Sequence, residues 1–159
     1  MHPSSILFVC LGNICRSPMA EGVFKKILFR EGIHQQFQVD SAGLIGYHQG
    51  ELADSRMRAH ASRREYNLTH RSRQVTKADF DKFDLIIGMD DQNIRGLNNL
   101  AQTPEQKAKI RRMTDFCVNM QATEVPDPYY GGAAGFEYVI DLLEDACEGL
   151  LNSISPPLP

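Results

Sequence analysis

The chain contains 159 residues, of which 42% are hydrophobic and 23% are charged, and its formal net charge is −3. This length and composition are typical of one globular domain that buries a core without disulfides or metals, and we place that domain at residues 1–154. The weak negative charge excludes a general electrostatic attraction to nucleic acid or to a membrane surface, so neither is expected as a partner.

The first predicted element is a buried strand that leads directly into a tight loop and a helix. Residues 6–9 form a continuous apolar run, as in a strand that is covered on both faces. Pro18 suits the first position of a helix, because that position does not need the N–H that proline lacks. A loop between a strand and a helix start points backbone N–H groups inward, and it therefore predicts an anion site.

Cys10 and Arg16 make this anion site reactive in the interpretation that we favour. The guanidinium fork of Arg16 matches a phosphate, and the donors around Cys10 favour its thiolate, which is a nucleophile. Ser17 can donate a hydrogen bond to the sulfur, and Gly12 permits a close turn. The alternative interpretation is that Cys10 is an ordinary buried cysteine at the end of a strand.

A helix and a second strand are predicted next. Apolar residues recur at helical spacing from Met19 to about Gly32, and glycine is a common helix stop. Residues 37–43 have the pattern of a short strand. The order strand, helix, strand implies a right-handed crossover and a parallel pair of strands.

The following segment is rich in arginine. A helix is predicted over residues 54–66, with Asp54 or Ser55 as its cap, although its apolar stripe is thin. Six arginines crowd this region: Arg56, Arg58, Arg63, Arg64, Arg71 and Arg73. They indicate either a solvated helix face or a basic rim that attracts phosphorylated ligands.

The second half of the chain continues the alternation of strands and helices. Residues 85–89 are predicted to form a third strand, Asp90 and Asp91 to cap a helix that reaches about Leu100, and residues 110–113 to form a weak fourth strand. The clearest helix is the last one, with an apolar stripe at Phe136, Val139, Ile140, Leu143, Cys147, Leu150 and Leu151. This order predicts an α/β fold, a single doubly wound domain with a central four-stranded parallel sheet and helices on both faces. The ligand is expected at the carboxyl ends of the strands, beside the Cys10 loop.

A second chemical element lies between two prolines. A thiolate that attacks a phosphate monoester must expel an alkoxide or a phenoxide, so a proton donor is needed near the pocket. Asp127 lies between Pro126 and Pro128, which restrict the backbone, and glycines follow at positions 131 and 132. Asp-Pro is also a common turn signal, so from chemistry alone Asp127 remains one candidate.

The cysteines and the motifs exclude several other classes of site. The four cysteines are too few and too scattered for a secreted disulfide framework: Cys10, Cys15, Cys117 and Cys147. No spacing suggests zinc and no glycine-rich nucleotide motif occurs, so we expect neither a metal nor a cofactor. No apolar run approaches the length of a membrane span and the first residues lack a basic signal region, which favours a cytoplasmic protein. Residues 155–159 are expected to form a flexible tail.

The loop resembles the signature of one known family. Val-Cys-Leu-Gly-Asn-Ile-Cys-Arg-Ser-Pro, at residues 9–18, is similar to the motif of the low-molecular-weight protein tyrosine phosphatases, whose chains are about as long as this one. The resemblance implies a phosphate-binding loop made of Leu11, Gly12, Asn13, Ile14, Cys15 and Arg16. It also implies that Asp127 is the acid and that Tyr129 and Tyr130 flank the pocket.

The resemblance further implies residues that support the loop and line the cleft. Asn13 tolerates a left-handed backbone, and the family implies hydrogen bonds to it from Ser17, Ser41 and His70. A lone histidine is more often structural, and His70 would be structural in holding this loop. Tyr47 matches an aromatic position opposite Tyr129, and Leu11 is placed in the same substrate wall. No role is assigned to the other histidines, which are His2, His34, His48 and His60.

The favoured hypothesis is a two-step phosphatase with a cysteinyl-phosphate intermediate. Its substrates would be phosphotyrosine in a protein or peptide and small aryl phosphates, and its product would be inorganic phosphate. One alternative is a thiol-linked arsenate reductase, which would need a third thiol that neither Cys117 nor Cys147 is well placed to supply. Another is a non-catalytic phosphotyrosine-binding module, which would not need Asp127.

The two cysteines of the loop form a candidate redox pair. A loop that curls around an anion brings Cys10 and Cys15 close, and a disulfide requires Cα atoms within about 7 Å. Peroxide would oxidise Cys10 to a sulfenic acid that a nearby thiol can trap. The resemblance implies the same pair, and the alternative is that Cys15 only packs against the sheet.

Overall fold

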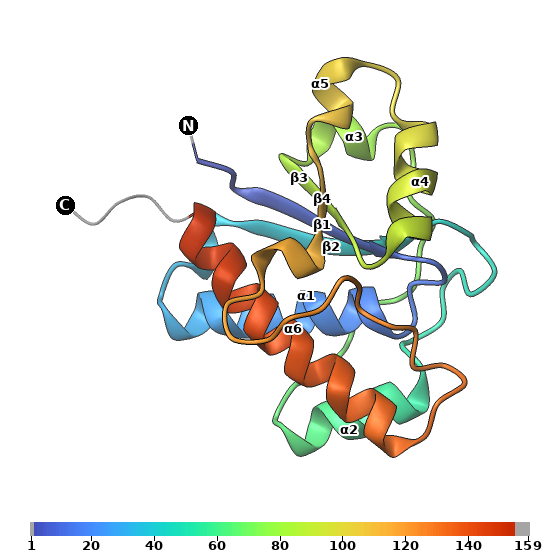
Figure 1. Cartoon of the computed structure of the whole chain (residues 1–159), viewed down its shortest axis with the longest axis vertical. Helices are drawn as coiled ribbons and strands as arrows, with labels where there is room; N and C mark the ends of the chain where they lie inside the picture. The colour runs from blue at the N-terminus through green and yellow to red at the C-terminus, as the bar shows by residue number, and fades with distance from the viewer. Residues whose placement is uncertain (1, 155–159) are drawn as a thin grey trace.

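A four-stranded parallel sheet forms the centre of the computed structural model, which describes residues 2–154 (Figure 1). The strand order is β2-β1-β3-β4, with β1 at Ser5–Cys10, β2 at Gln38–Gly43, β3 at Leu85–Gly88 and β4 at Ile110–Arg112. All three pairings are parallel. This sheet confirms the predicted fold class. The predicted tail at residues 155–159 lies outside the described residues.

Helices cover both faces of the sheet. On one face lie α1 (Arg16–Arg30), α6 (Ala133–Ile154) and, beside α6, the shorter α2 (Ser55–Arg63). The other face carries α4 (Asp91–Leu100) with two helices of one turn, α3 (Asp79–Lys82) and α5 (Pro104–Lys107). Two short 3-10 helices, η1 (His34–Gln36) and η2 (Met113–Phe116), complete the secondary structure of the described residues.

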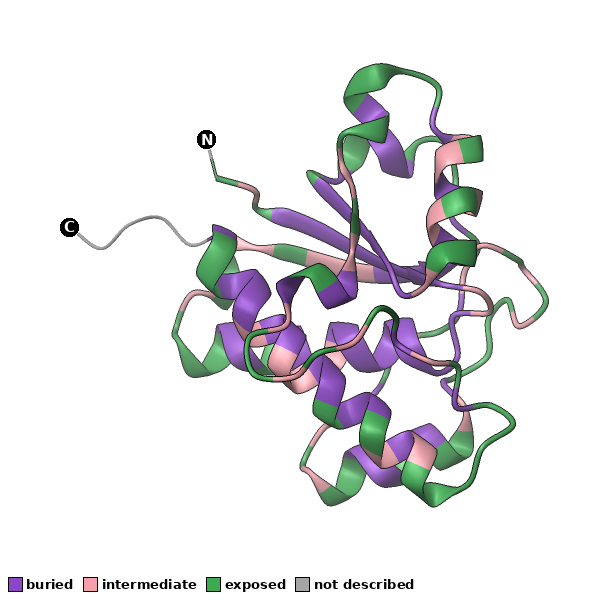
Figure 2. Ribbon diagram, viewed as in Figure 1, coloured by how far each residue is buried: buried purple, intermediate pink, exposed green. Residues whose placement is uncertain are grey.

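The alternation of side chains along β1 divides the interior into two cores. Ile6 and Phe8 point toward α1 and α6 and belong to the larger core. Leu7 and Val9 point toward α3 and α4 and belong to the smaller one. Successive side chains of a strand point to opposite faces, so a strand that is covered on both faces is buried along its whole length, as β1 is in Figure 2.

The predicted helix boundaries near the loop need correction. Helix α1 begins at Arg16, two residues before the predicted start at Pro18, so Pro18 is its third residue and not its first. The N–H groups of the first turn have no partner within a helix, so proline is tolerated there. Gly32 follows the end of α1 with a left-handed φ of 71°, which confirms it as a stop. Helix α2 ends at Arg63, before the predicted end at Tyr66.

The short elements were not predicted from the sequence. Helices α3 and α5 have four residues each, too few for a hydrophobic period to be visible. Asp90 caps α4 as predicted, since its carboxylate accepts the backbone N–H of Asn93. No helix in residues 2–154 has both the length and the apolar character needed to cross a membrane.

The strand order creates a crevice at the end of β1. Strand β1 has β2 on one side and β3 on the other, and the helices that follow β1 and β3 lie on opposite faces of the sheet. Ligands of doubly wound sheets bind where the connections diverge in this way, at the carboxyl ends of the strands. The loop after Cys10 occupies this position.

Candidate active site

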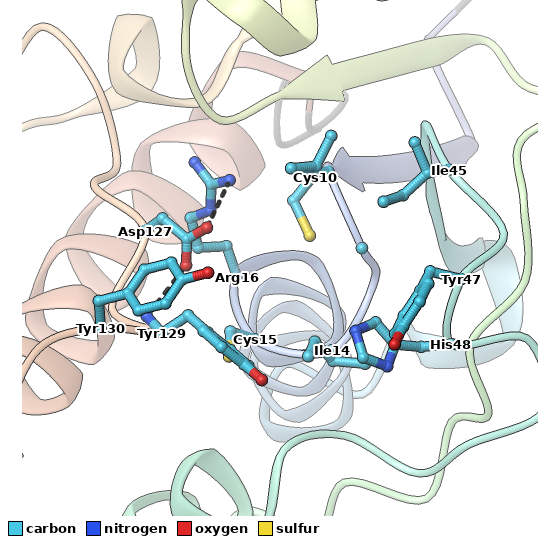
Figure 3. Close-up of a pocket in the computed structure, with 12 residues that line it drawn as sticks. Cys10, Ile14, Cys15, Arg16, Ile45, Tyr47, His48, Asp127, Tyr129 and Tyr130 are labelled. Carbon is cyan, nitrogen blue, oxygen red and sulfur yellow. Dashed lines mark hydrogen bonds and ion pairs between the residues drawn. The ribbon is translucent and has the colours of Figure 1, made fainter.

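A cavity of about 360 Å³ opens at the carboxyl end of β1 (Figure 3). Three segments that are far apart in the sequence line it, and they contribute Cys10, Leu11, Gly12, Ile14, Cys15 and Arg16, then Ile45, Tyr47 and His48, and finally Asp127, Tyr129 and Tyr130. In Figure 3, Tyr129 and Tyr130 lie on one side of the cavity and Tyr47 on the other. The cavity therefore contains most of the residues that the sequence singled out.

Cys10 lies at the floor of the cavity with a hydroxyl beside its sulfur. Its Sγ is 3.0 Å from Oγ of Ser17, in the first turn of α1. The side-chain amide of Asn13 donates to the same Oγ at 2.8 Å, which leaves the hydroxyl hydrogen of Ser17 for the Cys10 sulfur or for the carbonyl of Ala42, 3.4 Å away. The Ser17 hydroxyl is the polar group that lies closest to the nucleophile candidate among its hydrogen-bond partners.

Asn13 fastens the loop to three other parts of the chain. Its backbone is left-handed, with φ of 58°, and its side chain is 1% exposed. The amide nitrogen also donates to Oγ of Ser41 at 3.0 Å, and the amide oxygen accepts the backbone N–H of Arg73 at 3.1 Å. His70 Nε2 lies 2.9 Å from this oxygen and so must be a donor. The special backbone conformation belongs to Asn13 and not to Gly12, which has no positive φ.

A buried carboxylate that the sequence analysis missed supports His70. Nδ1 of His70 lies 3.4 Å from Glu21 and 3.3 Å from Asp40, and Glu21 accepts the hydroxyl of Ser41 at 2.7 Å. Glu21, Asp40 and His70 are the one group among residues 2–154 whose ligand atoms lie close enough to hold a metal ion, within 4.8 Å of one another. Protein donors already occupy this group, which therefore fits a support for the loop better than a metal site.

Arg16 is the buried cation of the cavity. It is 3% exposed, and its Nη1 donates to Asp90 at 2.6 Å and to the carbonyl of Val125 at 3.0 Å. Burial by itself would lower the pKa of Arg16, but the Cys10 sulfur and the Asp90 carboxylate raise it above its ordinary value. The guanidinium therefore stays charged, and its Nε and Nη2 form the edge that Asp90 does not use. The sequence analysis predicted Asp90 only as a helix cap.

Asp127 reaches the cavity from the loop before α6. Its side chain is 43% exposed, and its Oδ2 lies 3.7 Å from Nη2 of Arg16. Its Oδ1 accepts the backbone N–H of Tyr129 at 3.0 Å, which fixes the carboxylate relative to the neighbouring ring. The backbone N–H of Val125 donates to Met89 at the end of β3, at 2.8 Å, and ties the start of this loop to the sheet.

Arg56 holds the other end of the Asp127 loop, a role that no sequence signal indicated. Its guanidinium carbon is 5.2 Å from the ring centre of Tyr129 and 5.0 Å from that of Phe136 in α6. Asp54 pairs with this guanidinium through both carboxylate oxygens, at 3.1 and 3.0 Å. The backbone N–H of Asp54 donates to the carbonyl of Ile14 at 2.8 Å. Asp54 and Arg56 together thus connect the Cys10 loop to the wall of the cavity.

His48 and Ile45 also line the cavity, and neither was a sequence candidate. His48 is hydrogen-bonded to Glu51 through Nδ1, and its ring stands edge-on to Tyr47 at 4.8 Å. A Cβ on Gly12 would lie 3.3 Å from this ring, so glycine makes room for it. The absence of hydrophobic periodicity in this loop explains why no pattern pointed to these residues.

The four cysteines separate into two groups. Cys10 and Cys15 line the cavity, whereas Cys117 and Cys147 lie elsewhere, Cys147 within the core. Burial raises the pKa of the Cys15 thiol far above its ordinary value, and the carboxylate of Asp54 raises it further. Cys15 is therefore a neutral thiol near pH 7.

Comparisons with known proteins agree with this geometry. Residues 5–157 match the family model described as low molecular weight phosphotyrosine protein phosphatase. A relative from Synechocystis sp. is 47% identical over 155 residues, which span 96% of this chain and 98% of that protein. The low molecular weight phosphotyrosine protein phosphatase of Homo sapiens is 41% identical over 93% of this chain and 94% of its own length. A crystal structure of a protein tyrosine phosphatase from Entamoeba histolytica superposes with a TM-score of 0.92 at 49% identity, and covers 94% of this chain and 96% of that one.

Proposed function

Because the chain belongs to the low molecular weight phosphotyrosine protein phosphatase family, we propose that it hydrolyses phosphotyrosine in proteins and peptides with Cys10 as nucleophile, Arg16 as anion clamp and Asp127 as acid and base. It is a phosphoric monoester hydrolase of the protein-tyrosine-phosphatase class. One observation carries the assignment of roles. A single cavity brings a thiol, a buried guanidinium and a carboxylate together, although more than a hundred residues separate Asp127 from the other two.

In the first step the Cys10 thiolate attacks phosphorus in line with the bond to the tyrosine oxygen. The S–P bond forms as the P–O bond breaks, and Asp127 gives its proton to the departing phenolate. The free edge of Arg16 and the backbone N–H groups of residues 11–16 stabilise the negative charge on the equatorial oxygens. Asp90 supports this role, because it holds Nη1 and leaves Nε and Nη2 for the phosphate.

In the second step Asp127, now a carboxylate, takes a proton from a water molecule. The water oxygen attacks phosphorus, the S–P bond breaks and the Cys10 thiolate leaves. Inorganic phosphate is released and Asp127 is protonated again for the next cycle. The hydroxyl of Ser17, 3.0 Å from the sulfur, stabilises the thiolate both as a nucleophile and as a leaving group.

The walls of the cavity favour an aryl ester over an alkyl one. Tyr47 and Tyr129 lie on opposite sides of the entrance, and Tyr130 stands edge-on to Tyr129 at 5.0 Å. Aromatic walls on both sides suit a planar phenyl ring that extends from the phosphate at the floor. Leu11 and Ile45 add apolar surface to the same lining.

The direct test compares phosphotyrosine, phosphoserine and aryl phosphate hydrolysis, with and without EDTA. We expect turnover of the phosphotyrosine peptide and the aryl phosphate, at rates that EDTA does not change, and little turnover of phosphoserine. Arsenate with a thiol reductant, assayed in parallel, tests the alternative of an arsenate reductase. Arsenite formation at a rate comparable to phosphate release would overturn the proposed function.

We also propose that the protein works in a reducing compartment, as expected for the cytoplasm. The proposed chemistry requires Cys10 as a free thiolate, and the described structure contains its four cysteines in the unpaired form. A disulfide at Cys10 would remove the nucleophile. Fractionation of cells that express the tagged full chain tests the location.

A further inference from the structure

The structure divides the six arginines that the sequence brought together. Arg64 pairs with carboxylates of α6, Arg73 with Asp40 and Asp79, and Arg56 with Asp54. Arg63 is exposed on the surface of α2. Arg58 and Arg71 differ from the paired group, because neither forms an ion pair with any carboxylate of residues 2–154, and both face one cavity.

This cavity is separate from the active site and has a volume of about 690 Å³. Besides the two arginines, the polar residues Ser62, Asn67 and Thr69 line it, together with Tyr66, whose hydroxyl donates to Glu144 of α6. Glu65 is the one carboxylate of the lining, so the charged side chains leave an excess of one positive charge. We propose that this cavity is a second oxyanion site, which takes phosphate or the phosphate group of a phosphorylated small molecule.

The two guanidinium groups are held in place by the same stretch of backbone. Nε of Arg58 donates to the carbonyl of Ala53 at 2.9 Å, and Nη1 of Arg71 donates to the carbonyl of Gly50 at 3.0 Å. Each bond uses one donor and leaves the remaining N–H groups for a ligand. The anchored residues Gly50 and Ala53 are three positions apart, so their Cα atoms lie within about 11 Å. A phosphate group accepts several charge-assisted hydrogen bonds at once, so it can use the free N–H groups of both guanidinium groups.

The site also adjoins the supports of the catalytic loop. Arg71 stands between His70 and Ser72, and both of these side chains bond to Asn13, one through its amide oxygen and the other through its carbonyl. The bridge between Leu52 and Arg71 joins the two walls of the cavity. An anion bound to Arg58 and Arg71 would therefore contact residues 50–54 and 70–72, the segments that also make hydrogen bonds to the phosphate loop.

Inorganic phosphate titrated into the isotope-labelled full chain, at constant ionic strength, tests the proposal by amide NMR. We expect two separable groups of shifted signals, one from residues 11–16 and the other from residues 50–52, 58–62 and 69–71. Arg58→Met and Arg71→Met should each weaken the second event at least tenfold and leave the first unchanged. Arg63→Met is the matched control on the same helix and should retain both events.

Several results would overturn the second site. These are a single group of shifts in the wild type, a second group that survives in the Arg58→Met/Arg71→Met variant, or equal shifts with chloride alone. Arg58→Lys keeps the charge and loses the planar fork, so it should bind phosphate at the second site with intermediate affinity. This conservative variant distinguishes a loss of binding from a folding defect. Phenylphosphonate in place of phosphate then separates the two sources. Tighter binding of phenylphosphonate indicates an organic phosphate ligand, and tighter binding of phosphate indicates the free ion.

Discussion

The two segments that carry the proposed catalytic residues are held in different ways. The phosphate loop is largely buried, and the Asn13 side chain alone makes hydrogen bonds to four partners, which come from α1, β2 and the segment before α3. The Asp127 segment is half-exposed and is held by Arg16 at 3.7 Å, a turn to Tyr129 and the stacking of Arg56. A clamp for a charged group needs fixed donors, whereas an acid that serves two successive steps needs access to substrate and water.

From this difference we expect substitutions in one segment to reduce activity toward all substrates, and substitutions in the other to reduce activity by an amount that depends on the substrate. In the proposed mechanism, Cys10 and Arg16 of the phosphate loop act on the transferred group itself, which is the same for all substrates. In the Asp127 segment, the side chains act on the leaving group and on the ring. The following predictions test this division in order of decreasing effect.

The largest effect is expected at the nucleophile. Cys10→Ser should reduce kcat on the order of 10⁴-fold or more, because a neutral hydroxyl is a far weaker nucleophile than a thiolate. Binding of inorganic phosphate should persist, since Arg16 and Asn13 remain in place. Steady-state hydrolysis and phosphate binding measure the two effects, with Cys117→Ser, outside the cavity, as the control. Activity close to wild type in Cys10→Ser would disprove covalent catalysis by this residue.

The next largest effect is expected at the clamp. Arg16→Lys keeps the charge but loses the fork, so kcat/KM should fall about 10²- to 10³-fold, roughly 2.7–4 kcal/mol of transition-state stabilisation. The loss should be the same for every aryl phosphate, since the transferred group does not change. A loss of less than about tenfold would show that Arg16 does not hold the phosphoryl group.

Asp127 should give a loss that depends on the leaving group. Asp127→Ala should slow the release of phenols with high pKa by about 10²-fold, and of activated phenols much less, because these leave without a proton. A plot of log kcat/KM against the pKa of the phenol measures the dependence, and its slope should be steeper in the variant. Parallel plots for the variant and the wild type would show that Asp127 only shapes its loop and is not the proton donor.

Arg56 should have a smaller effect of the same kind. Arg56→Met removes the charge that stacks on Tyr129, so kcat/KM for aryl phosphates should fall about three- to tenfold. The leaving-group slope should shift toward that of Asp127→Ala if Arg56 positions the acid through Tyr129. Arg63→Met, exposed on the same helix, controls for loss of charge. An unchanged slope together with a lowered melting temperature would assign Arg56 to stability alone.

The last prediction concerns how much activity a dithiol restores after treatment with peroxide, and not the rate of turnover. We expect peroxide to convert Cys10 to a sulfenic acid, which then condenses with the Cys15 thiol to give a disulfide and water. The raised pKa of Cys15 means that its thiolate fraction grows with pH, so disulfide formation should become faster as the solution is made more alkaline. Mass spectrometry of the loop peptide measures the disulfide, and each protein is compared with its own untreated activity. Equal recovery of Cys15→Ser and wild type after a dithiol would exclude Cys15 as the resolving thiol.

Much of the fold follows from local patterns in the sequence. The buried strand β1, the stop at Gly32, the cap at Asp90 and the apolar stripe of α6 each depend on a few adjacent residues, and the structure contains all of them. The predicted start of α1 came later than the observed start at Arg16, because proline is compatible with any position of the first helical turn. The one-turn helices escaped prediction because four residues show no period.

The candidate site divides in the same way. Cys10 and Arg16 are close together in one short loop, so a thiol and a guanidinium that line the same cavity could be predicted from the sequence. Asp127 was a specific candidate only through the family resemblance, since nothing in a proline-flanked aspartate says which cavity it will enter. His48 and Glu21 carried no signal, and Arg56 was noted only as one of six arginines, without its contact to Tyr129.

What the tertiary structure alone decided is which distant groups complete each local motif. The order β2-β1-β3-β4 brings the ends of β2 and β3 to either side of the Cys10 loop, and with them Ser41 against Asn13 and Asp90 against Arg16. The same packing decides which arginines meet carboxylates and which two face an open cavity. The physical reason is the range of the interactions. Strand patterns, caps and turns are set by residues a few positions apart, whereas a hydrogen bond or an ion pair between remote segments exists only once the sheet and the two cores have formed.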